Sequence, residues 1–223
     1  IHGGGADLEF PHHTNEIAQS EAKTGKTFAN YWMHNGFVNI DNVKMSKSLG
    51  NFITVHDALK TIDGQVLRFF FATQHYRKPI NFTEKAVRDA ETNLKYLKNT
   101  YEQPFTGEVD PADLQSFVDK FIAAMDEDIN AANGITVVFE LAKWINSGHY
   151  NQDVKDALTK MLEVFGVVFV EEVLDADIEA LIAERQEARA KKDFARADAI
   201  RDELAAQGIK LLDTKEGVRW TRD

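Results

Sequence analysis

The first sixteen residues, IHGGGADLEFPHHTNE, constrain the fold more than any other part of this 223-residue chain. An apolar residue runs directly into His2 and three glycines, and a cluster of histidine and acidic side chains follows. Glycine lets a backbone turn sharply or approach a ligand closely, because it has no Cβ atom. The segment predicts the end of a buried strand that opens into a functional loop. Since no Met precedes it, we expect the chain to be part of a longer protein.

The composition is that of an ordinary soluble globular protein, with 43% hydrophobic and 28% charged residues. No apolar run reaches membrane-spanning length and no signal peptide begins the chain, so we expect a cytoplasmic protein without a membrane partner. The absence of cysteine excludes disulfides and any thiolate metal site built from this chain alone. A net charge of −10 argues against a general nucleic-acid coat, although a local basic face can still bind RNA.

The pattern predicts a mainly α fold with some β, in four regions. Residues 1–52 hold the glycine triplet, most of the histidines and a strand-like run at 36–40, and residues 53–82 carry a helix signal and an apolar run. Apolar periodicity over residues 83–170 predicts a bundle of four helices. Residues 176–223 predict a small α+β region. Its expected elements are helices at 177–192 and 194–206, a helix stop at Gly208, and two short strands between Ile209 and Trp220 around a turn at Glu216 and Gly217.

His12 and Glu16 are four residues apart, which places both side chains on one face of a helix. Pro11 suits the first turn of that helix. An imidazole and a carboxylate so placed can share a zinc ion. The alternative is a surface ion pair, and this chain has no obvious further ligands.

The glycines at positions 3–5 and Asp7 suggest a second interaction. A backbone without side chains can approach a ligand, and the Asp7 carboxylate can accept hydrogen bonds from ribose hydroxyls. The alternative is a plain turn between a strand and a helix.

The most specific motif is KMSKS at residues 44–48, where Lys44 and Lys47 flank a serine. Two ammonium groups on a mobile loop suit a polyphosphate whose charge grows as pyrophosphate departs. A solvated basic turn would explain the lysine spacing alone, but not the complete string.

Together these motifs resemble cysteinyl-tRNA synthetases, a family of class I aminoacyl-tRNA synthetases. The resemblance rests on HGGGADLEFPHHTNEIAQSE, NYWMHNGFV and KMSKSLGNF, and it continues through HYRKPINFT at 75–83, MDEDIN at 125–130 and the charged carboxyl-terminal helices. It implies the carboxyl-terminal portion of such an enzyme, without the first half of the catalytic domain and its HIGH-type motif. The regions are then the remnant of a Rossmann-like catalytic domain with the KMSKS loop (1–52), a connecting region (53–82), a tRNA-binding bundle (83–170) and an anticodon-binding region (176–223).

The resemblance also implies an activity and its site residues. The reaction is activation of cysteine by ATP and transfer of the cysteinyl group to tRNA-Cys, by a monomer. Zinc recognises the cysteine thiolate, held by His12, Glu16 and two cysteines that this chain lacks. Soft thiolate binds zinc well and a serine hydroxyl does not. His2, Lys44 and Lys47 match catalytic positions, and Gly5, Asp7 and Lys47 match ATP-binding positions. The expected tRNA contacts are Arg185, Arg189, Lys192, Arg219 and Trp220.

Three other functions fit part of the sequence. A related ligase that joins cysteine to an amino-sugar shares the zinc and KMSKS residues, but it lacks a typical anticodon-binding tail. A non-catalytic tRNA-binding module explains the helices but not the intact catalytic strings. A zinc hydrolase built on His12, His13 and Glu16 needs a further ligand and a general base, and His34, His56 and His75 show no pattern that assigns them. We expect the isolated chain to be inactive and to bind zinc weakly, because two of four ligands are missing.

Overall fold

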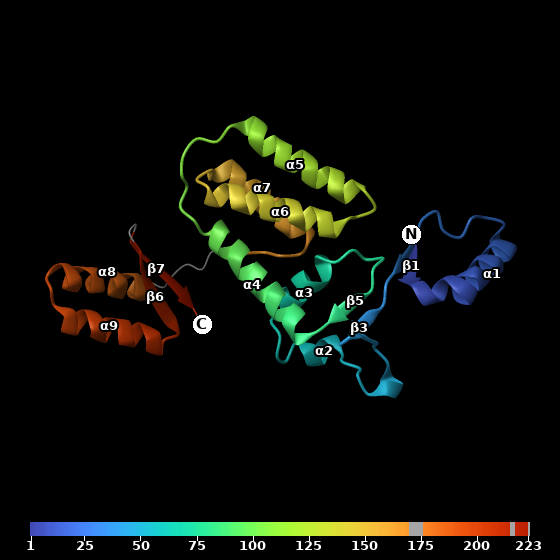
Figure 1. Ribbon diagram of the computed structural model, residues 1–223, viewed down its shortest axis with the longest axis horizontal. Helices are drawn as coiled ribbons and strands as arrows, with labels where there is room; N and C mark the ends of the chain where they lie inside the picture. Colours follow the sequence, from blue (N-terminus) through green and yellow to red (C-terminus); the bar gives the residue numbers. More distant parts are fainter. Residues whose placement is uncertain (170–175, 215–216, 223) are drawn as a thin grey trace. The chain divides into compact units, whose positions relative to one another are not determined.

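The computed structural model describes residues 1–169, 176–214 and 217–222, which form two compact units divided after Phe169. Over these described residues the fold is mainly helical with three small sheets, which confirms the predicted class (Figure 1). Among the described residues, no helix combines the length and apolar character needed to cross a membrane. The finer division into four domains stays a prediction.

The chain begins with a two-stranded parallel sheet. Strand β1 (His2–Gly5) pairs with β2 (Trp32–Asn35), and the helix α1 (Thr14–Thr24) connects them after the short turns η1 (Ala6–Leu8) and η2 (Glu9–His13). Gly25 ends α1 in the left-handed region that glycine favours, at φ +65°. The prediction of a buried first strand is wrong: β1 is only partly covered, because among the described residues it pairs on one edge alone.

A second sheet, in the order β4-β3-β5, carries the KMSKS segment. Strand β3 (Val38–Ile40) turns back antiparallel into β4 (Val43–Lys44), and β5 (Ile80–Phe82) joins β3 in parallel. The strand predicted from residue 36 starts two residues later. The turn η3 (Lys47–Leu49) follows β4 after Met45 and Ser46. The segment at residues 44–50, called the lysine loop below, is therefore anchored on one side by a sheet.

The apolar run after this loop forms a helix. The short helix α2 (Val55–Ala58) precedes α3 (Gly64–Ala72), whose first turn is capped by the Asp63 carboxylate on two backbone N–H groups. Val66, Leu67, Phe69 and Phe70 on α3 are buried.

Four helices then form the predicted bundle: α4 (Glu84–Tyr101), α5 (Pro111–Asp126), α6 (Ala131–Asn146) and α7 (Gln152–Val164). Each helix is capped at its start by a side-chain oxygen that accepts a hydrogen bond from a backbone N–H of the first turn. The capping residues are Thr83, Asp110, Asn130 and Asn151. One core runs from α3 through all four helices, with Leu97, Val138, Leu141 and Leu158 fully buried. The bundle and the connecting segments thus share one hydrophobic core.

The second unit contains α8 (Ala176–Ala190), α9 (Phe194–Ala206) and the antiparallel strands β6 (Ile209–Thr214) and β7 (Gly217–Arg222). Its core is formed by Ile178, Ile200, Leu204 and Ile209. Gly208 follows α9 at φ +78°, which confirms the predicted helix stop. Glu216, in the predicted turn, lies outside the described residues.

An exposed carboxylate joins the segment before β5 to the turn between α5 and α6. Asp128 accepts hydrogen bonds from the Tyr76 hydroxyl at 2.7 Å and from Arg77 Nε at 2.6 Å and Nη2 at 3.1 Å. These donors lower the pKa of Asp128 to about 2, with the Arg77 hydrogen bonds as the largest cause. Asp128 itself has a left-handed backbone, at φ +58°. The ionised carboxylate therefore fastens this turn to the sheet region.

We expect the stabilisation from Asp128 to be lost in acid. Because its folded pKa lies below its ordinary value of 3.8, it stabilises the fold fully above about pH 4. That contribution declines as pH falls through about 2. Urea unfolding at pH 5 and at pH 2.5 should therefore show a stability gap between the wild type and Asp128→Asn that narrows in acid. A gap that stays constant over this range would contradict the assignment.

Candidate active site

Strand register brings the aromatic and histidine side chains of the first sheet to one face. In the parallel pairing His2 lies beside Trp32, and Gly4 beside His34. Because side chains alternate along a strand, residues two apart share a face. His2, Trp32 and His34 thus share one side of the sheet. The ring centroids of His2 and Trp32 are 5.0 Å apart.

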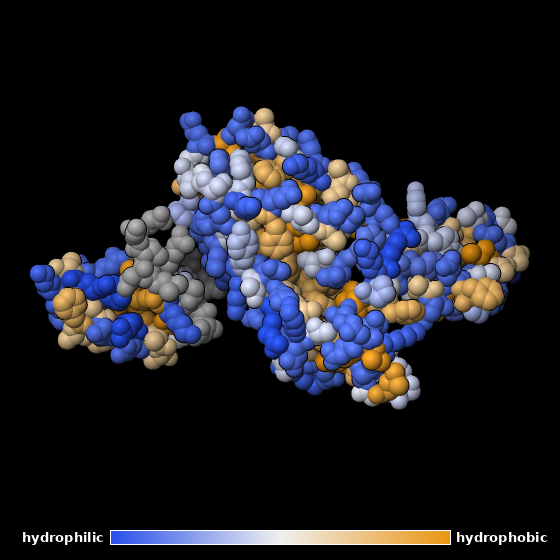
Figure 2. All heavy atoms as spheres, in the orientation of Figure 1, coloured by the Kyte–Doolittle hydropathy of each residue, from blue (hydrophilic) through white to orange (hydrophobic). Residues whose placement is uncertain are grey.

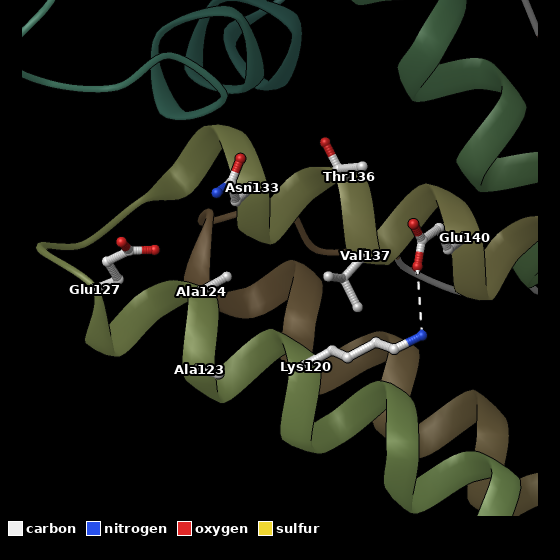
Figure 3. Close-up of a pocket in the computed structure, with 8 residues that line it drawn as sticks. All are labelled: Lys120, Ala123, Ala124, Glu127, Asn133, Thr136, Val137 and Glu140. Carbon is white, nitrogen blue, oxygen red and sulfur yellow. Dashed lines mark ion pairs between the residues drawn. The ribbon is translucent and has the colours of Figure 1, made fainter.

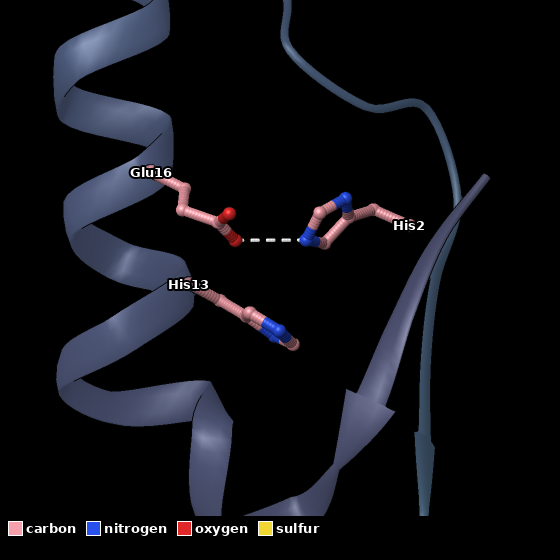
Figure 4. A group of neighbouring side chains, drawn as sticks. All are labelled: His2, His13 and Glu16. Carbon is pink, nitrogen blue, oxygen red and sulfur yellow. Dashed lines mark hydrogen bonds and ion pairs between the residues drawn. The ribbon is translucent and has the colours of Figure 1, made fainter.

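The turn η2 and helix α1 add His13 and Glu16 to this face. His2 Nε2 lies 2.8 Å from Glu16 Oε2, and His13 Nδ1 lies 2.8 Å from His34 Nε2. Figure 4 shows His2 and Glu16 meeting across the gap between strand and helix, with His13 beside them. The site is a network of three histidines and one carboxylate.

His13 is the buried member of this network, with 3% of its surface exposed. Burial lowers the pKa of His13, and the neighbouring His2 and His34 lower it further. A neutral ring suits the hydrogen bond to His34, in which one imidazole donates and the other accepts. Gly4 makes room for this ring: a Cβ there would lie 3.1 Å from His13 Cε1 and 2.9 Å from Leu8 Cδ1. At this position the glycine triplet serves internal packing.

The predicted zinc pair lies at the edge of the network. His12 Nε2 is 3.8 Å from Glu16 Oε1, and the two side chains are 60% and 33% exposed. Imidazole nitrogen and carboxylate oxygen are zinc donors, and a metal can approach this exposed pair. The pair therefore fits half of a four-ligand shell. His2, His13 and Glu16 also place ligand atoms within 4.8 Å of one another, so Glu16 belongs to both arrangements.

The site also contains three residues with no role predicted from the sequence: Phe28, Trp32 and His34. Phe28 lies 5.0 Å from the His2 ring, and Trp32 stacks against His34 at 6.3 Å. The NYWMHNGFV string was a signal for two of them, but their contacts depend on how β2 pairs with β1. These rings make one wall of the site aromatic.

The lysine loop lies within reach of the opening segment. Lys44 Nζ is 4.0 Å from Asp7 Oδ2 and 4.0 Å from the centre of the Phe37 ring. Lys47 Nζ lies 5.3 Å from the Phe52 ring centre. Asp7 and Lys44 are both more than half exposed, so a ligand can reach them. The structure thus brings together the residues predicted to contact ribose and polyphosphate.

Exposed apolar side chains surround this loop. Leu49, Phe52, Val55 and Leu59 are between 46% and 64% exposed. Figure 2 shows orange atoms among hydrophilic ones in the region of α2. The loop therefore lies on an open surface of the larger unit.

The predicted tRNA contacts differ in exposure. Arg185 is buried, with 6% of its surface exposed, whereas Arg189 and Lys192 are exposed. Trp220 is partly buried and packs against the core of the second unit, so a packing role also accounts for an aromatic residue at this position. Arg219 lies in β7, opposite Leu212. Exposure favours Arg189 and Lys192 as contacts, and all five residues stay predictions.

A shallow pocket lies elsewhere in the larger unit, between α5 and α6. Its volume is about 410 Å³, and Figure 3 shows Lys120 extending across it to pair with Glu140 at 3.9 Å. Its other lining residues are Ala123, Ala124, Glu127, Asn133, Thr136 and Val137. Its only lysine is paired with a carboxylate, so it offers little to a nucleotide. The histidine network and the lysine loop remain the candidate site.

Comparison with known families agrees with this geometry. The family described as tRNA synthetases class I (C) catalytic domain matches residues 1–92. The DALR domain family matches residues 120–171, and the family described as cysteinyl-tRNA ligase anticodon binding domain matches residues 171–220. A leucyl-tRNA synthetase from Agrobacterium radiobacter K84, solved in a ternary complex, shares the fold with a TM-score of 0.53 at 16% identity. The match covers 73% of this chain and 25% of that one. The match over residues 1–92 and the shared fold are those of class I aminoacyl-tRNA synthetases.

Curated relatives identify the member of that class. A cysteine–tRNA ligase of Streptococcus pneumoniae serotype 4 (strain TIGR4) is 86% identical over all 223 residues, and one of Streptococcus mutans serotype c is 82% identical. The chain spans about half the length of these relatives, 50% in each case. It belongs to the cysteinyl-tRNA synthetase family.

Proposed function

We propose that this chain is part of a cysteine–tRNA ligase. The cysteine carboxylate attacks the α-phosphate of ATP, forming cysteinyl-adenylate and releasing pyrophosphate. The 3′ end of tRNA-Cys then attacks the carbonyl carbon and releases AMP. This chemistry depends on in-line positioning and charge stabilisation more than on acid–base groups.

One observation carries this proposal: Lys44 of the KMSKS segment lies 4.0 Å from Asp7 of the opening segment. A ribose held by Asp7 and the backbone at Gly5 would leave the polyphosphate near Lys44 and Lys47. Two ammonium groups there offset the charge that develops on departing pyrophosphate. His2 stands in the aromatic wall beside Glu16, where it would contact the bound amino acid.

We propose that His12 and Glu16 hold zinc together with two thiolates from outside this chain. Zinc, when bound, supplies a soft ligand site for the substrate thiol, which distinguishes cysteine from serine. His2 Nε2, which lies 2.8 Å from Glu16 Oε2, would orient the carboxylate, as outer-shell partners of metal ligands do. Two donors alone leave this chain with a weak metal site.

The tRNA partner is supported by the anticodon-domain match and by the exposed Arg189 and Lys192. That match also favours the synthetase over the amino-sugar ligase, which lacks such a tail. A monomeric, cytoplasmic enzyme belongs to the proposal on the family resemblance alone.

The test is a full-length enzyme made by joining this chain to the remaining half of the Streptococcus pneumoniae relative, called the full-length chimera below. It should attach radiolabelled cysteine to tRNA-Cys in the presence of ATP. Failure of a folded chimera to charge tRNA-Cys, while the intact relative charges it, would overturn the proposal.

Substitution of Glu16 tests the metal assignment. We expect Glu16→Gln to weaken zinc binding by the chimera by more than about 100-fold, since even outer-shell changes cost 10- to 100-fold. The measurement is zinc competition against a chromophoric chelator. Glu9→Gln is the matched control, an exposed carboxylate in the preceding turn. Equal zinc affinity in the Glu16 and Glu9 variants would remove Glu16 from the shell.

A further inference from the structure

Asn51, which follows the lysine loop, bonds through its side chain to two points of the loop backbone. Its Oδ1 accepts the backbone N–H of Ser46 at 2.9 Å, and its Nδ2 donates to the backbone carbonyl of Lys44 at 3.2 Å. The Asn51 side-chain amide thus accepts one hydrogen bond and donates another, to the residues on either side of Met45. Among the twenty side chains, only asparagine and glutamine carry both groups on one amide.

The backbone from Ser46 to Gly50 folds back on itself, which brings the Asn51 side chain to the start of the loop. Leu49 N–H donates to the Ser46 carbonyl at 3.2 Å, and Gly50 N–H to the Lys47 carbonyl at 3.3 Å. Gly50 takes a left-handed φ of +70°, which reverses the chain direction. On the other side, Met45 N–H donates to the Val38 carbonyl at 3.1 Å and fixes the loop to β3.

We propose that Asn51 is a positioning residue that sets the backbone from which Lys44 and Lys47 reach the ATP polyphosphate, an inference that rests on the proposed function. The ammonium groups sit on long flexible stems, so their position depends on where the backbone is held. Without the amide, the partly buried N–H of Ser46 loses its acceptor and the loop loses its closure. In this proposal Asn51 acts through the lysines, because its side-chain amide is engaged by the loop backbone.

The kinetic test uses Asn51→Ala in the full-length chimera. We expect kcat for cysteine-dependent ATP–pyrophosphate exchange to fall about 10- to 100-fold, because small displacements of positioned groups have effects of this size. The KM for cysteine should change less than about threefold, since the two hydrogen bonds of Asn51 go to the KMSKS backbone and not to the proposed zinc pair. Asn99→Ala, at an exposed position on α4, is the control and should match the wild type. Equal kcat in the two variants would overturn the proposal.

Hydrogen exchange on the isolated chain gives a second readout that does not need activity. Asn51→Ala should accelerate exchange of the Ser46 amide about tenfold or more, while amides in the bundle stay as protected as in the wild type. An inactive wild-type chimera would contradict the proposed function, whereas unchanged Ser46 exchange would contradict the role of Asn51. The two failures are therefore distinguishable.

Discussion

Replacing Lys47 by alanine in the full-length chimera is expected to slow cysteinyl-adenylate formation about 100- to 1000-fold. Lys47 stands at the start of η3, beside the Phe52 ring and on the exposed face of the loop. Its charge is needed most when pyrophosphate leaves, so the loss should fall on kcat more than on the KM for ATP.

Single-turnover formation of the adenylate measures this loss directly. Lys23→Ala is the matched control, because Lys23 is an exposed lysine in the last turn of α1. It should keep the wild-type rate. A Lys47 variant that forms adenylate within threefold of the Lys23 variant would show that the loop lysine does not stabilise the leaving group.

Gly36→Ala is expected to destabilise the larger unit by about 3 kcal/mol or more. A Cβ at position 36 would lie 2.4 Å from the backbone carbonyl carbon and oxygen of Lys78 and 2.6 Å from the nitrogen of Pro79. These are backbone atoms, so no side-chain rotation relieves the clash. Gly36 N–H also donates to the Tyr76 carbonyl at 2.7 Å. The substitution would separate the two segments that bring β3 and β5 together.

Urea unfolding of the isolated chain, followed by circular dichroism, measures this cost. Gly64→Ala is the matched control, because its Cβ would meet only Leu59 Cδ2 at an ordinary 3.6 Å. Since Gly64 begins α3, alanine there should stabilise the helix by up to about 1 kcal/mol. Equal stability of the two variants would mean that the backbones at 36 and 78 can separate freely.

Local patterns predicted much of the fold. Apolar periodicity over residues 83–170 was sufficient for the four helices, because each buries one face in a shared core. Gly208 marked the end of α9 for a local reason, its left-handed backbone. The parallel pairing of β3 with β5 was not predictable in this way, since about forty residues separate the strands and no turn specifies their register.

In the candidate site, too, local spacing predicted some neighbours and long-range pairing produced the others. His12 and Glu16 share a helix face, so spacing alone placed them near each other. Trp32 and His34 join His2 through the register of β1 on β2, and His13 reaches His34 from the turn η2. Sequence spacing determines neither arrangement. The role of Asn51 was not predicted for another reason. Its side chain bonds to two backbone atoms, and the sequence does not specify which backbone atoms a side chain will meet.

The central claim is that this chain supplies one part of a cysteine-activating pocket, with its metal-binding pair and lysine loop, and needs the other half for activity. ATP–pyrophosphate exchange, measured in parallel on the isolated chain and the full-length chimera, tests this most directly. We predict exchange by the chimera that depends on cysteine and is not supported by serine, and none by the isolated chain. Robust exchange by the isolated chain, or a folded chimera that responds equally to serine, would contradict it.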